Sequence, residues 1–89
     1  MKITITPVKN PAIAWDITVS VEAEGKERIA EVTTEINDAP EPTDFLKPAA
    51  NFYENTFIQK GVFPGKNKVI VTAKDEDGNP TIAVKKWDS

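Results

Sequence analysis

Apolar and polar residues alternate along most of this chain. Between positions 15 and 23 the odd positions are apolar, and the even positions carry charged or hydroxyl side chains. A period of two separates these sets onto opposite faces of a β-strand. The same alternation occurs in residues 2–6 and 67–75. We therefore expect one buried face from each of two sheets to meet in a core, formed by Trp15, Ile17, Val19, Val21, Val69, Val71 and Ala73.

Short turn signals separate these runs. Residues 24–27 predict a tight turn, and residues 61–65 predict a corner. Asp77-Gly78 is a strong hairpin signal, because glycine readily adopts the positive φ that such turns require. The hairpin leads into a last predicted strand from Thr81 to Trp87. This spacing of strands and turns is typical of a β-sandwich.

Residues 26–36 fit two patterns. Ile29, Val32 and Ile36 have the spacing of an amphipathic helix face. The same stretch also alternates as a strand, with Ala30, Val32 and Ile36 on its apolar side and Ile29 near its start. A strand is favoured, because the segment is β-branched and its start has no helix N-cap.

The alternation is lost between residues 37 and 51, which contain three prolines. This composition predicts a loop, with at most one short helical turn near residues 43–50. Residues 52–60 resume an aromatic, strand-like pattern. The fold class is therefore all-β: a sandwich of about six or seven antiparallel strands, in a single domain spanning residues 1–89.

Residues 63–79 show a specific order: an apolar residue, Pro-Gly, an Asn, an alternating strand that ends on Ala-x-Asp, and a Gly-Asn hairpin. This string resembles the end of a bacterial immunoglobulin-like domain, and the resemblance extends over residues 61–87. It implies an immunoglobulin-like sandwich. It implies no single function, because function depends on sites carried by a fold. The chain departs from the antibody-type pattern, because it has no cysteine pair.

Composition narrows the possible chemistry. The chain has no Cys and no His, and its formal net charge is −3. These absences remove thiol nucleophiles, Ser-His catalysis and the usual zinc ligands. We therefore expect a non-enzyme with no cofactor, no metal, no nucleic-acid partner and no membrane insertion.

Three charged features have separate interpretations. Asp75, Asp77 and Asn79 have calcium-loop spacing, but Pro80 and Lys86 occupy positions where an EF-hand loop requires Gly and Glu. We expect a turn, with a calcium-dependent adhesion domain as the competing class. The acidic residues Glu27, Glu31 and Glu35 are either a solvated, edge-protecting face or a contact for a basic partner. The six lysines between Lys60 and Lys86 are expected to be solvated.

The candidate contact surface is the proline-rich segment 38–53. Phe45 and Leu46 lie between Asp44 and Lys47, as an apolar anchor within a polar rim would. The competing interpretation is that the pair plugs the open side of the sandwich. The candidate partner-binding residues are Asp44, Phe45, Leu46, Tyr53, Glu27, Glu31 and Glu35.

The sequence favours a non-catalytic structural or protein-interaction module of immunoglobulin-like fold, whose partner is another protein. The alternative is a small acidic inhibitor or immunity-type protein that blocks a basic site. The first residues lack the apolar core of a signal peptide. A complete chain would therefore be cytoplasmic, whereas a piece of a longer protein could come from an extracellular or virion protein.

Overall fold

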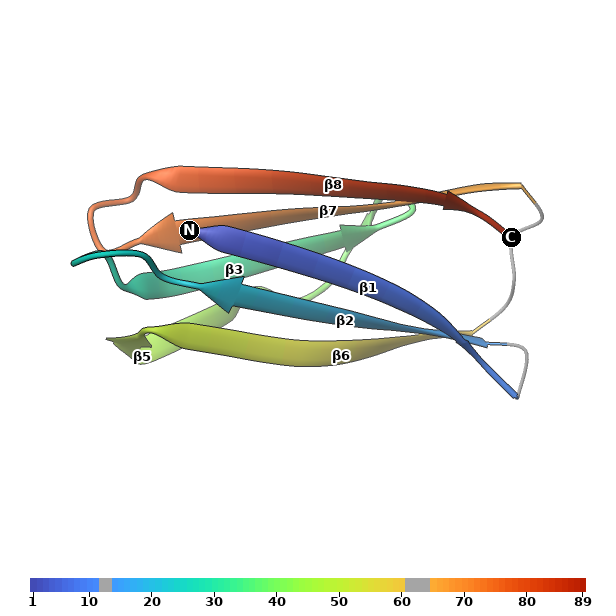
Figure 1. Cartoon of the computed structure of the whole chain (residues 1–89), viewed down its shortest axis with the longest axis horizontal. Coiled ribbons are helices and arrows are strands. Elements are labelled where there is room, and N and C mark those ends of the chain that lie inside the picture. The colour runs from blue at the N-terminus through green and yellow to red at the C-terminus, as the bar shows by residue number, and fades with distance from the viewer. Residues whose placement is uncertain (12–13, 61–64) are drawn as a thin grey trace.

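The computed structural model describes residues 1–11, 14–60 and 65–89, and these residues are all-β with no helix. Eight strands run mostly along the long axis of the molecule (Figure 1). The strands are β1 (Lys2–Asn10), β2 (Ala14–Glu22), β3 (Ile29–Ile36), β4 (Ala39–Pro40), β5 (Asp44–Ala50), β6 (Phe52–Lys60), β7 (Lys66–Asp75) and β8 (Pro80–Asp88).

The strands form two antiparallel sheets. One has three strands in the order β1-β2-β6. The other has five, in the order β4-β3-β7-β8, with β5 also paired to β3. Strands β4 and β5 share one side of β3, where β4 pairs with residues 35–36 and β5 with residues 29–32. The predicted all-β sandwich is confirmed.

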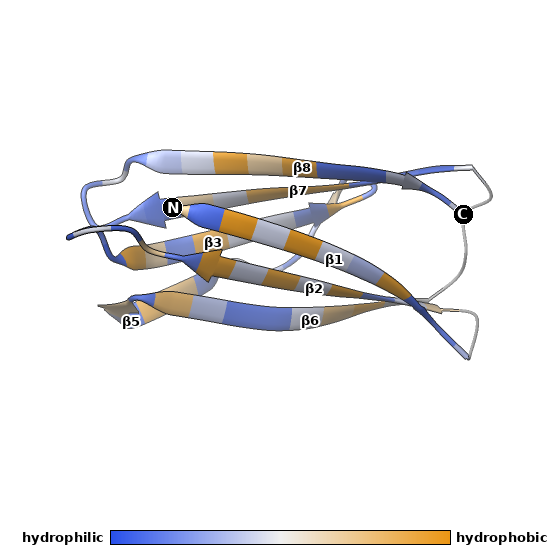
Figure 2. Ribbon diagram, in the orientation of Figure 1, coloured by the Kyte–Doolittle hydropathy of each residue, from blue (hydrophilic) through white to orange (hydrophobic). Residues whose placement is uncertain are grey.

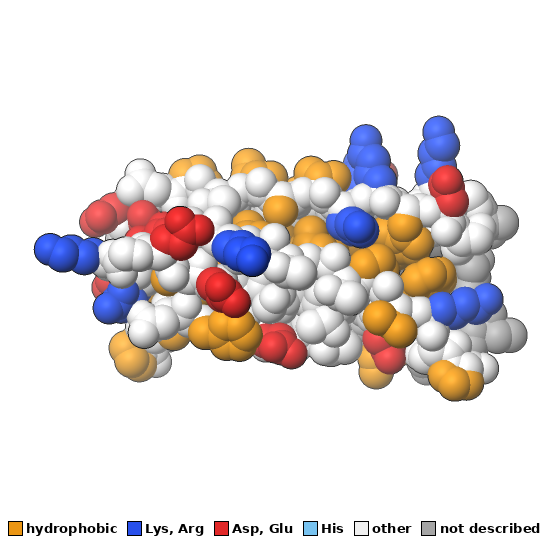
Figure 3. All heavy atoms as spheres, viewed as in Figure 1, with side chains coloured by type: hydrophobic (Ala, Val, Ile, Leu, Met, Phe, Trp, Pro, Cys, Tyr) orange, Lys and Arg blue, Asp and Glu red, His pale blue; other side chains and the backbone are white. Residues whose placement is uncertain are grey.

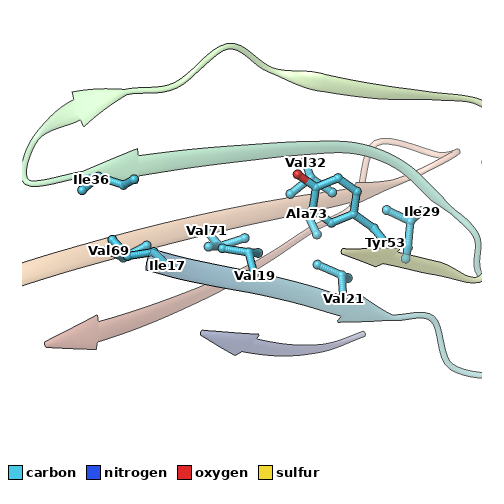
Figure 4. Packing of buried hydrophobic residues seen from close by; sticks show 10 residues of the cluster. All are labelled: Ile17, Val19, Val21, Ile29, Val32, Ile36, Tyr53, Val69, Val71 and Ala73. Atoms are coloured by element: carbon cyan, nitrogen blue, oxygen red, sulfur yellow. The ribbon is translucent and has the colours of Figure 1, made fainter. Parts of the chain in front are cut away.

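The core lies between the two sheets (Figure 4). Strand β2 supplies every second residue from Ile17 to Val21, and β7 supplies Val69, Val71 and Ala73. All six are fully buried, as the alternation predicts. The same alternation appears as bands of hydropathy along the strands (Figure 2). The core is completed by Ile29, Val32, Ile36 and Tyr53.

Trp15 is the exception among the predicted core residues, because it is only half-buried. It is the second residue of β2, and its ring packs against Trp87 of β8 with the ring centroids 5.6 Å apart. Trp15 therefore packs near the end of its strand with another indole, outside the aliphatic cluster. Period two predicts the face of a residue but not how far the opposing sheet extends over it.

A β-bulge in β3 changes which of its residues point into the core. The register shifts between Ile29 and Glu31, so Ile29 and Ala30 together occupy the position opposite Asp75. Ile29 is consequently fully buried, while Ala30 is only partly buried. The sequence prediction was wrong to place Ala30 on the apolar side, because strict alternation cannot include an extra residue.

The proline-rich middle is more regular than its composition predicts. Residues 44–50, allowed as a short helical turn, form strand β5, and Phe45 pairs with Glu31. Strands β4 and β5 raise the total to eight. Asn37 and Asp38 both have positive φ in the tight turn between β3 and β4. Asn37 also accepts a hydrogen bond from the backbone N–H of Lys68 at 2.8 Å, which fastens the turn to β7.

The predicted hairpin between β7 and β8 is confirmed. Gly78 has φ +82°, a conformation that side-chain-bearing residues rarely adopt. The predicted corner of residues 61–65 lies mostly outside the described residues. Phe63 and Pro64, which contribute to the immunoglobulin-like string, belong to that part.

Candidate functional site

The outer face of the five-stranded sheet brings together residues that are far apart in the sequence. In its register Phe45 lies opposite Glu31, and Glu31 lies opposite Lys74. Phe45 is 65% exposed. The next row on this face joins Thr33, Thr72 and Ile82, and the row after it places Glu35 opposite Ile70, which in turn lies opposite Val84. An exposed aromatic ring and several charges therefore share one surface.

Segment 44–50 separates the two candidate anchors. Its strand conformation turns Phe45 toward solvent, whereas Leu46 packs against the core. Leu46 is thus the plug, and Phe45 is the only one of the pair free to serve as an anchor. The sequence treated them as a unit because they are adjacent apolar residues between Asp44 and Lys47, but a strand turns neighbouring side chains to opposite faces.

Beside Phe45 lies a shallow groove of about 490 Å³. Strand β5, the bulge of β3 and the hairpin between β7 and β8 form its walls. Both positive and negative side chains line it, among them Glu31, Lys47, Lys74 and Glu76. We name this surface the Phe45 groove.

The hairpin at one wall of the groove is organised by Asp75. Its Oδ1 accepts hydrogen bonds from the backbone N–H groups of Asp77 and Asn79, both at 2.9 Å. Its Oδ2 accepts one from Nδ2 of Asn79 at 3.1 Å. These bonds, led by the backbone bond from Asn79, lower the pKa of the Asp75 carboxyl. The carboxylate thus acts as a turn acceptor, which is the interpretation that the sequence favoured over calcium.

Tyr53 is buried in the sandwich and Asp44 is partly buried beside it, and neither residue lines the Phe45 groove. Tyr53 is only 9% exposed, and its hydroxyl donates a hydrogen bond to the Asp44 carboxylate. Asn55 donates a second bond to the same oxygen at 3.3 Å. Burial and then the bond to Asp44 raise the pKa of the Tyr53 phenol above its usual range. These candidate contact residues therefore connect β5 to β6 and offer a partner little surface.

The three candidate acidic residues do not form one face. Glu31 and Glu35 lie on the outer face of β3, on the same side as Phe45. Glu27 precedes the strand, and its Oε2 lies 3.0 Å from the amino group of Met1. It also accepts a hydrogen bond from the backbone N–H of Glu24 at 3.2 Å. The bulge and the turn before β3 interrupt the spacing of four residues that suggested a common surface.

Strand β8 adds apolar residues that the sequence did not single out. Ile82 and Val84 are 62% and 51% exposed, on the same outer face as Phe45. Figure 3 shows apolar side chains along the edge that β8 forms. The sequence of the last strand alternates, but both of its faces carry apolar residues, so the alternation alone did not show which face is exposed. Trp87 rather than Ile82 turned out to mark the inner face.

A second cleft of about 660 Å³ lies at the other end of the five-stranded sheet. Its lining includes Lys66, Lys68 and Lys86, together with Trp87. The Nζ of Lys68 lies 3.2 Å from Oδ1 of Asp38, and Asp88 supplies a further carboxylate. These acids offset most of the positive charge, so the cleft has no strong preference for one sign of ligand.

In the described part of the chain, no three His, Cys, Asp or Glu side chains are grouped to hold a metal ion. Nor does that part contain a helix with the length and apolar character of a membrane span. No protein-family model, no curated protein and no solved structure matches this chain.

Proposed function

We propose that the protein is a non-catalytic interaction module of immunoglobulin-like fold, which binds another protein through the outer face of its five-stranded sheet. The carrying observation is the exposed Phe45 ring beside a groove with charged walls. Aromatic anchors surrounded by polar residues are typical centres of protein–protein interfaces.

The strand order supports the immunoglobulin-like assignment. Immunoglobulin sandwiches place strands A, B and E in one sheet and strands C, F and G in the other. Here β1, β2 and β6 form one sheet, and β3, β7 and β8 lie in the other. Strand β5 departs from the constant-type arrangement, because it pairs with β3 instead of joining the first sheet.

The alternative is an acidic inhibitor of a basic site. Glu31 and Glu35 favour it, because both lie on the proposed surface. Lys74 lies opposite Glu31 on that face, and Lys68 and Lys86 lie opposite each other farther along it. This mixture of charges favours an interface with an apolar centre over one driven by acidic charge.

Site-specific photo-crosslinking tests the proposal. A crosslinker at position 45 should capture a partner from the source lysate, and Phe45→Ser should abolish capture in a pull-down without lowering the melting temperature. Val8→Ser is the control, because Val8 is also half-exposed but belongs to the three-stranded sheet. Equal capture by the wild type and Phe45→Ser would refute the proposal.

Salt dependence separates the two candidates. Binding through an apolar centre should persist in high salt, because exposed charge pairs are screened whereas apolar burial is not. An acidic inhibitor should lose its target as salt rises, and Glu31→Lys with Glu35→Lys should weaken it far more than Phe45→Ser does. That result would favour the acidic inhibitor over the interaction module.

A further inference from the structure

The free sheet edges differ in how they are guarded against pairing with another strand. Natural edges carry proline, lysine or an inward-pointing charge. Strand β1 has Pro7, and β5 has Lys47 and Pro48. Strand β8 has Lys85 opposite the buried Val69, on the inward side of its sheet. Each of these three edges therefore contains a residue that resists a further strand.

Strand β6 lacks these guards from Phe52 to Ile58, where Glu54 is the only charged residue and there is no proline. One of its edges pairs with β2, and in the described residues no strand pairs with the other edge. Phe52 and Ile58 are 50% and 67% exposed on the outer face of the sheet. This edge has the composition of a strand that is normally paired on both sides.

Hydrogen bonds identify the backbone groups at the open edge. The carbonyl of Asn51 accepts a bond from the backbone N–H of Ala23, so it points toward the β2 side. The N–H of Thr56 instead donates to the side-chain Oδ1 of Asn55 at 2.9 Å. Because the direction alternates along a strand, the groups of Phe52, Glu54, Thr56 and Ile58 face away from β2. The Asn55 side chain covers one of these donors.

We propose that a second copy of this chain pairs with this edge, antiparallel, about a two-fold axis through Asn55. In that register Phe52 lies opposite Ile58 of the second copy, Tyr53 opposite Phe57, and Glu54 opposite Thr56. The two three-stranded sheets become one continuous sheet, in the order β1-β2-β6 followed by the same strands reversed. The interface is isologous, as closed two-fold dimers require.

Self-complementarity identifies a second copy as the occupant. The register puts aromatic residues opposite aromatic or β-branched partners, which are favourable cross-strand pairs. It places no like charges opposite each other, because the single charged residue, Glu54, meets a threonine. An antiparallel register centred on Thr56 would place Glu54 opposite Ile58 and lose the aromatic pair. A two-fold axis at Asn55 is therefore the specific prediction.

The dimer has to displace one internal bond. The Asn55 amide covers the Thr56 N–H, and in the dimer this N–H bonds to the carbonyl of Glu54 in the second copy instead. The exchange leaves the bonds to β2 untouched, because they involve the alternate residues. Association is consequently concentration-dependent and does not require refolding.

Sedimentation equilibrium from micromolar to millimolar protein tests the pairing. The wild type should approach twice the 9.8 kDa mass of one chain. Thr56→Glu puts two Glu–Glu pairs across the axis and should raise the dissociation constant by about tenfold. Adding Glu54→Lys to that variant restores opposite charges and should restore the dimer. Thr4→Glu is the control, because it adds the same charge on the outer face of β1 and should leave the dissociation constant unchanged.

Amide hydrogen exchange gives a second readout that is independent of mass. Raising the protein concentration should slow exchange at Phe52, Glu54, Thr56 and Ile58, and leave Tyr53 and Asn55 unchanged. A chain that stays monomeric at millimolar concentration overturns the proposal. So does a dimer whose dissociation constant is insensitive to Thr56→Glu, because that dimer must use another surface.

Discussion

The two outer faces of the sandwich cover the same core with different chemistry. The middle of the three-stranded sheet presents a band of hydroxyls, in which Oγ1 of Thr18 lies 3.1 Å from Oγ1 of Thr56. The exposed apolar residues of this sheet, Val8, Phe52 and Ile58, lie in the rows at its two ends. The five-stranded sheet presents Phe45, Ile82 and Val84 among charged residues. Threonine satisfies the preference of a strand for β-branched residues without exposing much apolar surface. The two faces therefore differ in where their apolar side chains lie: at the ends of the three-stranded sheet, but beside the Phe45 groove and along β8 in the five-stranded sheet.

The largest expected effect tests whether both faces depend on one core. Ile17→Ala in the three-stranded sheet and Ile36→Ala in the five-stranded sheet should each lower the free energy of unfolding by about 2–5 kcal/mol, because both side chains are fully buried. Urea unfolding measures this. A loss below about 1 kcal/mol for either variant would mean that its sheet folds without the shared core.

The next effect concerns the bond that joins the sheets at β5 and β6. Tyr53→Phe keeps the ring and removes the hydroxyl bonded to Asp44, so it should cost about 1–3 kcal/mol of unfolding free energy. The matched change Tyr53→Leu should cost more, because it also removes ring contacts. Equal stability of wild type and Tyr53→Phe would show that the hydroxyl bond contributes nothing.

The same residue makes stability depend on alkaline pH. The pKa of Tyr53 is raised in the folded protein, so the folded state holds its proton after the unfolded state has lost it. This stabilisation is complete below the unfolded pKa of about 10 and is lost as pH rises above it. Thermal unfolding between neutral pH and pH ~11 should show the decline in the wild type and a smaller one in Tyr53→Phe. Parallel declines would contradict the assignment.

Exchanging the chemistry of the two faces should change surface behaviour with little effect on stability. Ile82→Thr with Val84→Thr replaces the exposed apolar side chains of β8 by hydroxyls, and Thr4→Val with Thr6→Val does the reverse in the hydroxyl band of the three-stranded sheet. Each pair should stay within about 0.5 kcal/mol per substitution, because these side chains are exposed. Retention on a hydrophobic-interaction column should fall for the first pair and rise for the second. The opposite order would place the accessible apolar patch elsewhere.

The smallest effect comes from the ion pair between Met1, next to β1, and Glu27, next to β3. The hydrogen bond between them raises the pKa of the amino group and lowers that of the carboxyl. Its contribution is therefore present between about pH 4.5 and 8, and is lost as pH falls through the carboxyl pKa or rises through the amino pKa. Glu27→Gln should lower the melting temperature slightly inside this window and not outside it. A difference that persists at alkaline pH would indicate that Glu27 acts through the Glu24 backbone instead.

The sequence predicted those parts of the fold that depend on local alternation. Ile17, Val19 and Val21 are buried as expected, because a strand with one wet face shows its period directly. Segment 44–50 was not predicted as a strand, because its prolines indicate irregular structure. It forms a strand because it pairs with β3, and the sequence of the segment itself contains no sign of that pairing. Because the segment is a strand, Phe45 and Leu46, which the sequence analysis treated as a pair, lie on opposite faces of the sheet. Among the candidate contact residues, Phe45, Glu31 and Glu35 lie on one outer face because each is in a strand, and their role in binding stays a prediction.

The bulge at Ala30 has a consequence for the length of the chain. Side chains along a strand alternate between the two faces of the sheet, so adding or deleting one residue moves every following side chain to the opposite face. Ala30 is the exception, because it already interrupts this alternation: without it, Ile29 would be followed directly by outward Glu31 and inward Val32. Deletion of Ala30 should therefore preserve the fold, whereas deletion of Thr33 should destroy it. Strand β3 thus contains one position at which the chain can change length without exchanging its inside for its outside.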